Sequence, residues 1–266
     1  KAGASGAGAG QFGATIGHPA VNPTDGSVYV ADPANRRVQR FTSAGAFSYA
    51  FGWDVDPSGG SGELEKCTAI CQSGTGGSGL GQFSLTGAPS RVAVDATGVT
   101  YTVEPAFSTN GKMRVQRFNA TSTSASVFAP AYLSGTSASL AANNPTDVQV
   151  SRIDGTVFVA KAAGIEPPRT NERRILELDP SGKLLAVHAE GDGIPTGTGF
   201  GLAVNALSGR LYATANHRVF ILMHLPDPVA TIDPVTGITG TTATFSGSVD
   251  PTGYETGYRF EYVADE

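Results

Sequence analysis

The stretch GSVYVADPANRRVQRF (residues 26–41) contains two short apolar runs on either side of a turn. Val28 and Val30 lie in the first run, and Val38 and Phe41 lie in the second. The residues between the runs form an Asp-Pro-Ala-Asn sequence that is typical of turns. Short β-branched and aromatic runs that flank such a turn predict a β-hairpin.

This hairpin pattern recurs along the chain. It returns as GVTYTVEPAFSTNGKMRVQRF (98–118), GTVFVAKAAGIEPPRTNERRILEL (155–178) and GRLYATANHRVFIL (209–222). One aromatic and one arginine then align in every copy: Tyr29, Tyr101, Phe158 and Tyr212, with Arg37, Arg114, Arg174 and Arg218. Each copy follows an alternating apolar run: HPAVN (18–22), SRVAV (90–94), TDVQV (146–150) and GLAVN (201–205). We therefore expect each unit to begin with a strand that precedes the hairpin.

The composition also indicates an all-β chain. The 266 residues include 35 Gly and 16 Pro, and no stretch shows sustained helical periodicity. The net charge is −5 and the basic residues are scattered, so neither a nucleic acid nor an acidic membrane surface is a predicted partner. No apolar stretch reaches the roughly 18–20 residues that a membrane span requires.

A repeat of roughly 40–50 residues with four strands is typical of a β-propeller blade. Residues 1–9 are expected to form a flexible, Gly/Ala-rich lead-in, and residues 10–225 a propeller of about four blades. The expected blades are 10–52, 81–133, 136–190 and 195–225, with an inserted loop at 53–80. The first strands of the blades should lie nearest the axis. Four blades is the low end for a closed propeller. The alternatives to a closed circle of four blades are an open circle and a circle that another chain completes.

The first unit resembles an NHL repeat, the propeller blade of bacterial and animal proteins. The matching segments are GQF, PAVNPTDGSVYVADPANRRVQRF and GAFSYAFG, and the resemblance weakens along residues 10–225. Glu104, Lys161 and Ala215 replace Asp32 of the first unit in the later units. The inserted loop, with CTAIC and GLGQF, is similar to the cysteine loop of secreted bacterial NHL proteins.

Residues 226–266 resemble the start of the fibronectin type III-like modules that follow such propellers in bacterial surface proteins. The matching segments are TTATFSGSVDPTG and YRFEY. Three strands are expected, near 229–232, 242–249 and 257–263. An immunoglobulin-like sandwich has about seven strands, so this module is predicted to be partial.

Cys67 and Cys71 lie in a Gly- and Ser-rich loop, and two thiols so close together are expected to form a disulfide in an oxidising compartment. With a ring of only ~5 residues, the chain-entropy estimate of its stabilisation is roughly 2 kcal/mol. A metal pair or a redox pair is the alternative. The Cys-x3-Cys spacing lacks the second ligand pair of a zinc site and differs from the Cys-x-x-Cys of redox motifs.

The inserted loop also contains the spacing of a calcium loop. Asp54, Asp56, Ser58 and Glu65 supply oxygens at positions 1, 3, 5 and 12, and a glycine stands at position 6. No flanking helices are expected, and an acidic solvated loop explains the same residues. We therefore favour the solvated loop and expect no cofactor, with calcium as the alternative.

Some propellers of this kind are enzymes that bind metals around the central channel. The candidate side chains are His18, Asp32, Glu104 and His217, and His18 is the one histidine that we expect to face the channel. Asp32 has a simpler explanation as an acceptor for backbone N–H groups of the following turn. We therefore expect no catalytic residues, and the alternative is a metal-dependent lactonase or lyase that uses His18.

These features favour a non-enzymatic, exported scaffold or adhesion protein of a bacterial surface or extracellular assembly. A glycan-binding or peptide-binding propeller is a further alternative, with an extracellular glycan as its partner. The C-terminal strands alternate apolar with polar residues and need a covering sheet, because a ribbon of two or three strands is marginal in water. We expect copies of the chain to pair there by strand addition and to form a filament.

Overall fold

The computed structural model describes residues 5–84, 89–104, 114–133, 145–161, 174–188, 201–215, 217–222, 229–250, 259 and 261. The chain divides into an N-terminal body (Lys1–Leu222) and a C-terminal body (Met223–Glu266). The division lies three residues before the boundary predicted after residue 225. No helix among the described residues is long and apolar enough to cross a membrane.

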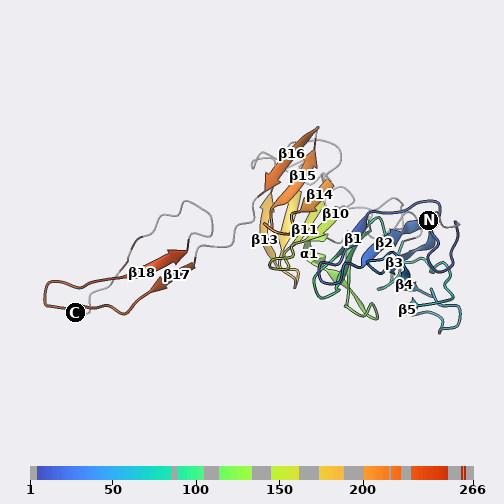
Figure 1. Ribbon diagram of the computed structural model, residues 1–266, viewed down its shortest axis with the longest axis horizontal. Coiled ribbons are helices and arrows are strands. Elements are labelled where there is room, and N and C mark those ends of the chain that lie inside the picture. The colour runs from blue at the N-terminus through green and yellow to red at the C-terminus, as the bar shows by residue number, and fades with distance from the viewer. Residues whose placement is uncertain are drawn as a thin grey trace. The chain divides into compact units, whose positions relative to one another are not determined.

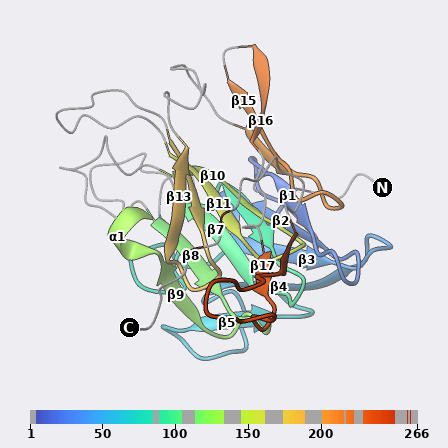
Figure 2. The same cartoon turned by 90° about the vertical axis from the view of Figure 1, so that its left-hand side faces the viewer.

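The described residues of the N-terminal body form four antiparallel sheets in chain order (Figures 1 and 2). Sheet I contains β1 (Pro19–Val21), β2 (Val28–Asp32), β3 (Arg37–Phe41), β4 (Phe47–Trp53) and β5 (Leu64–Cys67). Sheet II contains β6 (Arg91–Val94), β7 (Thr100–Glu104), β8 (Arg114–Phe118) and β9 (Ala125–Phe128), followed by the short helix α1 (Pro130–Leu133). Sheet III contains β10 (Pro145–Val150), β11 (Val157–Lys161), β12 (Arg174–Leu178) and β13 (Leu184–His188). Sheet IV contains β14 (Gly201–Val204), β15 (Leu211–Ala215) and β16 (Arg218–Leu222).

The predicted hairpins and their alignment are confirmed. Within every sheet the strands pair with their neighbours in sequence. The positions opposite the aligned arginines are equivalent in all four sheets: Asp32 pairs with Arg37, Glu104 with Arg114, Lys161 with Arg174, and Ala215 with Arg218. One strand was not expected, because β5 uses part of the segment 53–80 that the sequence predicts to be a loop.

The first strands of the four sheets lie beside one another, as predicted. Strand β1 contacts β6, β6 contacts β10, and β10 contacts β14. His18 and Arg91 form a parallel bridge between the starts of β1 and β6. Gly17 makes this approach possible, since a Cβ there would lie 2.6 Å from the carbonyl oxygen of Ser90. The sheets therefore radiate from a common line of first strands, as blades do in a propeller.

A hydrophobic core fills each of the three spaces between successive sheets. The aligned aromatic of each second strand points toward the following sheet. Tyr29 belongs to the core between sheets I and II, Tyr101 to that between sheets II and III, and Phe158 to that between sheets III and IV. All three are at least 98% buried. The fold is thus stabilised by repeated sheet-on-sheet packing.

The outer face of sheet IV is the exception. Its aligned aromatic, Tyr212, pairs with Ile221, and Thr214 pairs with Val219 on the same face. Ile221 is 54% exposed and Val219 is 65% exposed. This face corresponds to the three that are covered by a following sheet, so we call Tyr212, Thr214, Val219 and Ile221 the terminal face.

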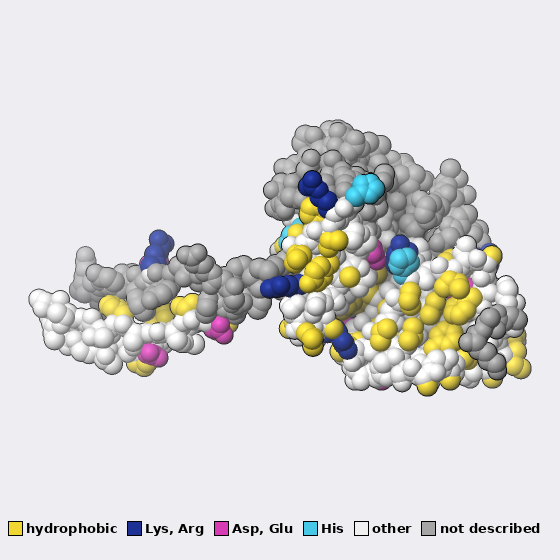
Figure 3. Space-filling view, turned by 45° about the horizontal axis from the view of Figure 1, so that its top comes forward, with side chains coloured by type: hydrophobic (Ala, Val, Ile, Leu, Met, Phe, Trp, Pro, Cys, Tyr) yellow, Lys and Arg dark blue, Asp and Glu magenta, His cyan; other side chains and the backbone are white. Residues whose placement is uncertain are grey.

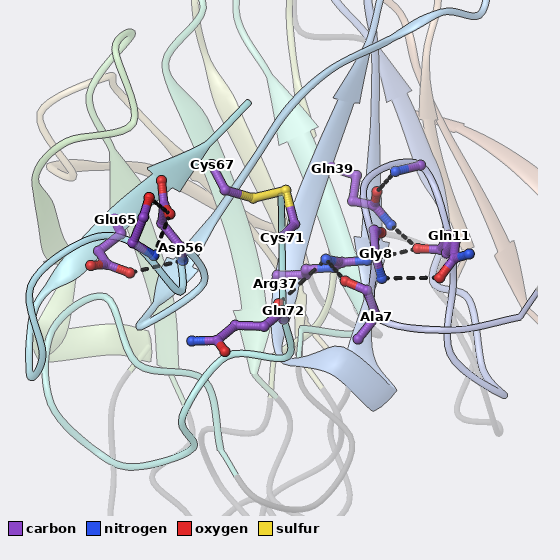
Figure 4. The surroundings of a disulfide bond; sticks show 12 residues. Ala7, Gly8, Gln11, Arg37, Gln39, Asp56, Glu65, Cys67, Cys71 and Gln72 are labelled. Carbon is purple, nitrogen blue, oxygen red and sulfur yellow. Dashed lines mark hydrogen bonds between the residues drawn. A yellow bond between two sulfur atoms is a disulfide. The ribbon is translucent and has the colours of Figure 1, made fainter. Parts of the chain in front are cut away.

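Buried polar side chains fasten the N-terminal segment to sheet I (Figure 4). The Arg37 side chain is fully buried, and its Nε lies 3.0 Å from Asp32 Oδ2. Its Nη2 donates to the carbonyl oxygens of Gly8 and Gln11 at 2.9 and 2.7 Å, and its Nη1 donates to that of Ala7. Gln39 completes the group: its Nε2 donates to Gln11 O, and its Oε1 accepts from Gly10 N. We call this acid, arginine and glutamine the sheet I clamp.

Sheet II contains the same clamp, built from Glu104, Arg114 and Gln116. Arg114 Nε lies 2.7 Å from Glu104 Oε1. The clamp holds the segment before sheet II by the carbonyl oxygens of Ser78, Gly79 and Gln82 and by the N–H of Gly81. Sheets III and IV cannot form it, because Lys161 and Ala215 replace the acid and Leu176 and Phe220 replace the glutamine.

The clamp corrects two predictions. Residues 5–9 are not a flexible lead-in, because Arg37 holds two of their carbonyl groups and Ser5 bridges to Phe12. Asp32 does not serve the backbone of the following turn. Its carboxylate accepts from Gly13 N and from the side chains of Asn35, Arg37 and Gln39.

The C-terminal body contains a two-stranded ribbon of β17 (Val229–Ile232) and β18 (Gly247–Asp250). The predicted strand at 229–232 is confirmed. The strand predicted at 242–249 is wrong in extent, since only 247–250 is a strand and Thr244 makes an isolated bridge to Thr236. Of the strand predicted at 257–263, only residues 259 and 261 are described, and neither is in a strand.

The clamp predicts a large effect for Arg37→Met. The substitution leaves the Asp32 carboxylate buried without its cation, which typically lowers the free energy of unfolding by about 3–5 kcal/mol. Segment 5–12 should also lose protection from hydrogen exchange. The control is Asp25→Asn, which removes the more exposed partner of Arg40 and should cost less than about 1 kcal/mol. Equal losses in chemical denaturation would contradict a dominant role for the clamp.

Candidate functional site

The first strands line a partly open cavity of about 250 Å³ to which all four sheets of the N-terminal body contribute. It lies at the ends of these strands, beside the turns that follow them, and we call it the axial cavity. Its lining residues are Pro19, Ala20, Val21 and Pro23, then Ala93 and Val94, then Gln149, Val150 and Arg152, and finally Val204 and Ala206. These residues are mostly small and apolar in type, but polar atoms make up more of the cavity surface than apolar atoms do.

Two side chains from the β10 region provide the polar groups of this cavity. Arg152 Nη2 donates to the carbonyl oxygen of Pro23 at 2.6 Å, which joins sheet III to the turn after β1. Within the described parts of the chain, Arg152 forms no ion pair with a carboxylate, and the Gln149 amide forms no hydrogen bond. The cavity thus combines a cation and an amide with a lining that exposes more polar than apolar surface.

At their opposite ends, the first strands bring together His18, Arg91 and Asp147. Arg91 Nε lies 3.7 Å from Asp147 Oδ1, and Asp147 Oδ2 accepts from the backbone N–H of Leu202 at 2.8 Å. With the bridge between His18 and Arg91, one group from each of the four sheets meets here. This axial cluster ties the four sheets together by polar contacts.

Burial raises the pKa of the Asp147 carboxyl above its ordinary value of 3.8, although the Leu202 N–H and the Arg91 guanidinium favour its charged form. The side chain of Asp147 is only 6% exposed, whereas that of Arg91 is 27% exposed. The neighbouring N–H and guanidinium groups therefore offset only part of the cost of burying the charged Asp147 carboxylate.

His18, predicted as the channel ligand of an enzyme, does lie at the line of first strands, where it is exposed. Its neighbour across the bridge is the guanidinium-bearing Arg91, whose positive charge opposes a divalent cation nearby. Among the described residues, no three His, Cys, Asp or Glu side chains gather as a metal site would require. Of the other candidates, Asp32 and Glu104 are buried in the clamps, and His217 is exposed before β16.

The predicted calcium-loop residues make separate local contacts. Asp54 Oδ1 accepts from Gly62 N, and Asp56 Oδ1 accepts from both the N–H and the hydroxyl of Ser58. Glu65 Oε2 accepts from Asp56 N at 2.9 Å. These carboxylates stabilise the turns of the inserted loop, and calcium binding there stays a prediction from the spacing.

The predicted disulfide between Cys67 and Cys71 is present (Figure 4). Both residues are buried, in a small core with Ala50 and Val55. The next residue, Gln72, donates its N–H to Val55 O and accepts from Arg37 Nη1. The disulfide therefore positions the inserted loop against the sheet I clamp.

Sequence reasoning did not identify the clamps, Asp147 or Arg152. A signal for the clamps was available, since both Gly-x-Gly-x-Gly-Gln-Phe (6–12 and 77–83) and Arg-Val-Gln (37–39 and 114–116) occur twice. Asp147 and Arg152 occur once each, in strands and turns whose neighbours come from other sheets. Their roles depend on contacts between residues distant in sequence.

No protein-family model matches this chain, and no curated protein matches it in sequence. Solved structures that are similar in fold include the nidogen/laminin complex, with 16% identity and a TM-score of 0.48 over 78% of this chain. The chain spans 60% of the length of that neighbour. A gluconolactonase from Xanthomonas campestris shows 13% identity and a TM-score of 0.30, with 77% of this chain and 84% of that one covered. The major Malassezia sympodialis allergen Mala s 1 shows 9% identity and a TM-score of 0.33, covering 87% and 78%.

The raised pKa of Asp147 predicts a specific pH dependence. Because the folded state binds this proton more tightly than the unfolded state, the stabilising contribution is present below pH 3.8 and is lost as pH rises through the folded pKa. We therefore expect Asp147→Asn to gain stability relative to the wild type as pH rises from about 4 to 7. Urea denaturation of both proteins across this range measures the difference. A constant difference would show that Asp147 does not titrate abnormally.

Proposed function

We propose that this protein is a non-enzymatic, exported scaffold or adhesion protein that binds other copies of itself. The observation that supports this most strongly is the terminal face of sheet IV. Three equivalent faces in the same chain are covered by a following sheet, whereas Val219 and Ile221 are exposed. Exposed apolar sheet surface of this kind is typical of a protein–protein contact.

A second copy of the chain is the partner that best fits the terminal face. Val92 and Val94 of β6, the first strand of sheet II, pack against sheet I. The corresponding strand of sheet I, β1, has Val21 60% exposed. Sheet I of a second copy could cover sheet IV in the same manner as the internal contacts, and such head-to-tail contacts generate rings or filaments.

The same proposal includes the type of propeller and the type of C-terminal module. We interpret the four sheets as blades of an NHL-type propeller, whose circle is either closed by sheets I and IV or opened to admit a partner. The C-terminal body would be the beginning of a fibronectin type III-like module. Further hydrophobic side chains gather in groups on the surface of the N-terminal body, as the space-filling view shows (Figure 3).

The ribbon of β17 and β18 offers a second route to self-assembly. Val229 and Ile232 are 57% and 74% exposed, and each strand has one edge without a partner among the described residues. Such edges accept a strand from another chain. The Cys67–Cys71 disulfide supports export to an oxidising compartment, at the cell surface or beyond it.

The two routes to self-assembly predict different results in size measurements. If the terminal face is the contact, the double variant Val219→Glu and Ile221→Glu becomes monomeric, because charges are costly to bury, while a chain ending at Leu222 still associates. If strand addition is the contact, the truncated chain is the monomer. Leu207→Glu serves as the control, because Leu207 is 93% exposed outside this face. Light scattering that finds every form monomeric would refute self-assembly.

Metal analysis of the purified protein tests the enzyme alternative. Because Arg91 neighbours His18, we expect neither stoichiometric zinc nor stoichiometric calcium, and no change in His18→Ala. Stoichiometric metal that disappears in His18→Ala would instead support a metal-dependent lactonase or lyase.

A further inference from the structure

We propose that the axial cavity binds a carboxylate group, carried either by a small organic acid or by an acidic side chain of another protein. This inference goes beyond the proposed self-assembly, which requires only the terminal face or the C-terminal ribbon. It rests on the charge, the unused hydrogen-bond donors and the size of the cavity.

The charge of the cavity is positive. Arg152 carries the single formal charge among the described lining residues, and none of these residues is acidic. Its bond to Pro23 O uses one N–H of Nη2 and holds the guanidinium at the cavity. The other donors of a guanidinium form a planar fork that matches the two oxygens of a carboxylate. Arg152 is thus positioned by one bond and has the remainder available for a ligand.

Gln149 adds a second hydrogen-bonding group from the same strand region. Its amide lines the cavity and makes no hydrogen bond within the described residues. The amide NH2 can donate to a carboxylate oxygen, while its carbonyl accepts from a neighbouring N–H or hydroxyl group. An acid that also carries an amide or hydroxyl group would therefore satisfy both ends of the Gln149 side chain.

The walls and the volume define the size of the ligand. Val21, Val94, Val150 and Val204 line the cavity from four sheets, and the surface that the lining exposes is more polar than apolar. The cavity measures about 250 Å³, below the range of about 300–1,000 Å³ typical of sites for drug-sized ligands. It therefore suits one side chain or a small acid.

Titration calorimetry with three probes tests this proposal: N-acetyl-glutamate amide, its neutral counterpart N-acetyl-glutamine amide, and succinate. We expect the two acids to bind, with N-acetyl-glutamine amide at least about tenfold weaker than N-acetyl-glutamate amide. Tighter binding of the capped glutamate than of succinate would indicate an acidic side chain as the natural ligand. The reverse order would indicate a free organic acid. Both orders support a carboxylate site.

Matched variants assign the binding to the axial cavity. Arg152→Gln should weaken the acidic probes at least about tenfold, and Gln149→Leu should weaken them without the loss of a charge. Arg210→Gln is the control, because it removes another exposed arginine from the turn after β14 and should change affinity less than about twofold. Circular dichroism confirms that each variant is folded.

The proposal is wrong if neither acid binds the wild type at about 10 mM, if the neutral probe binds equally well, or if both cavity variants bind as the wild type does. Because neither Arg152 nor Gln149 lies on the terminal face, failure here would leave the self-assembly measurement unaffected.

Discussion

The packing of each sheet against the next is the constraint on which this fold depends. A sheet of three to five strands has two faces, and a chain of this composition cannot leave both in water. Three aligned aromatic side chains each cover one face of their own sheet by packing in the space before the following sheet: Tyr29, Tyr101 and Phe158. Every sheet is therefore stabilised by a neighbour, and a position at the end of the series has an uncovered side.

The buried charged side chains stabilise the fold in a different way from the hydrophobic cores. A carboxylate and a guanidinium without water are stabilising only when all their hydrogen-bonding groups are satisfied. In both clamps the arginine reaches this state by donating to backbone carbonyls of a glycine-rich segment. The acid and arginine thus order a segment that its composition alone would leave flexible. Asp32 and Glu104, two of the candidate metal ligands in the sequence, are held in these clamps.

Much of the fold could be predicted from the sequence. The alternation of Val28 and Val30 and the turn after them determine a hairpin locally, and the repeats extend that conclusion to four sheets. The ordered state of residues 5–9 could not be predicted in this way, because small residues were held by side chains about 30 positions away. Asp147 and Arg152 illustrate the same limit for the candidate site. Each contacts a different sheet, and only the three-dimensional arrangement of the first strands brings those partners together.

Because the clamps lie in the first two sheets, we expect the two ends of the N-terminal body to resist pulling unequally. Sheets I and II each have a buried ion pair that locks the preceding segment in place, and sheet I also has a disulfide beside it. Sheet III has neither the acid nor the glutamine of the clamp, and sheet IV has neither of them and only three strands among the residues that the structure describes. When sheets contact mainly their neighbours, the least supported one detaches first. Tension applied through the C-terminal body would therefore peel sheet IV away before the others, so the chain would extend under load while its N-terminal half remained folded.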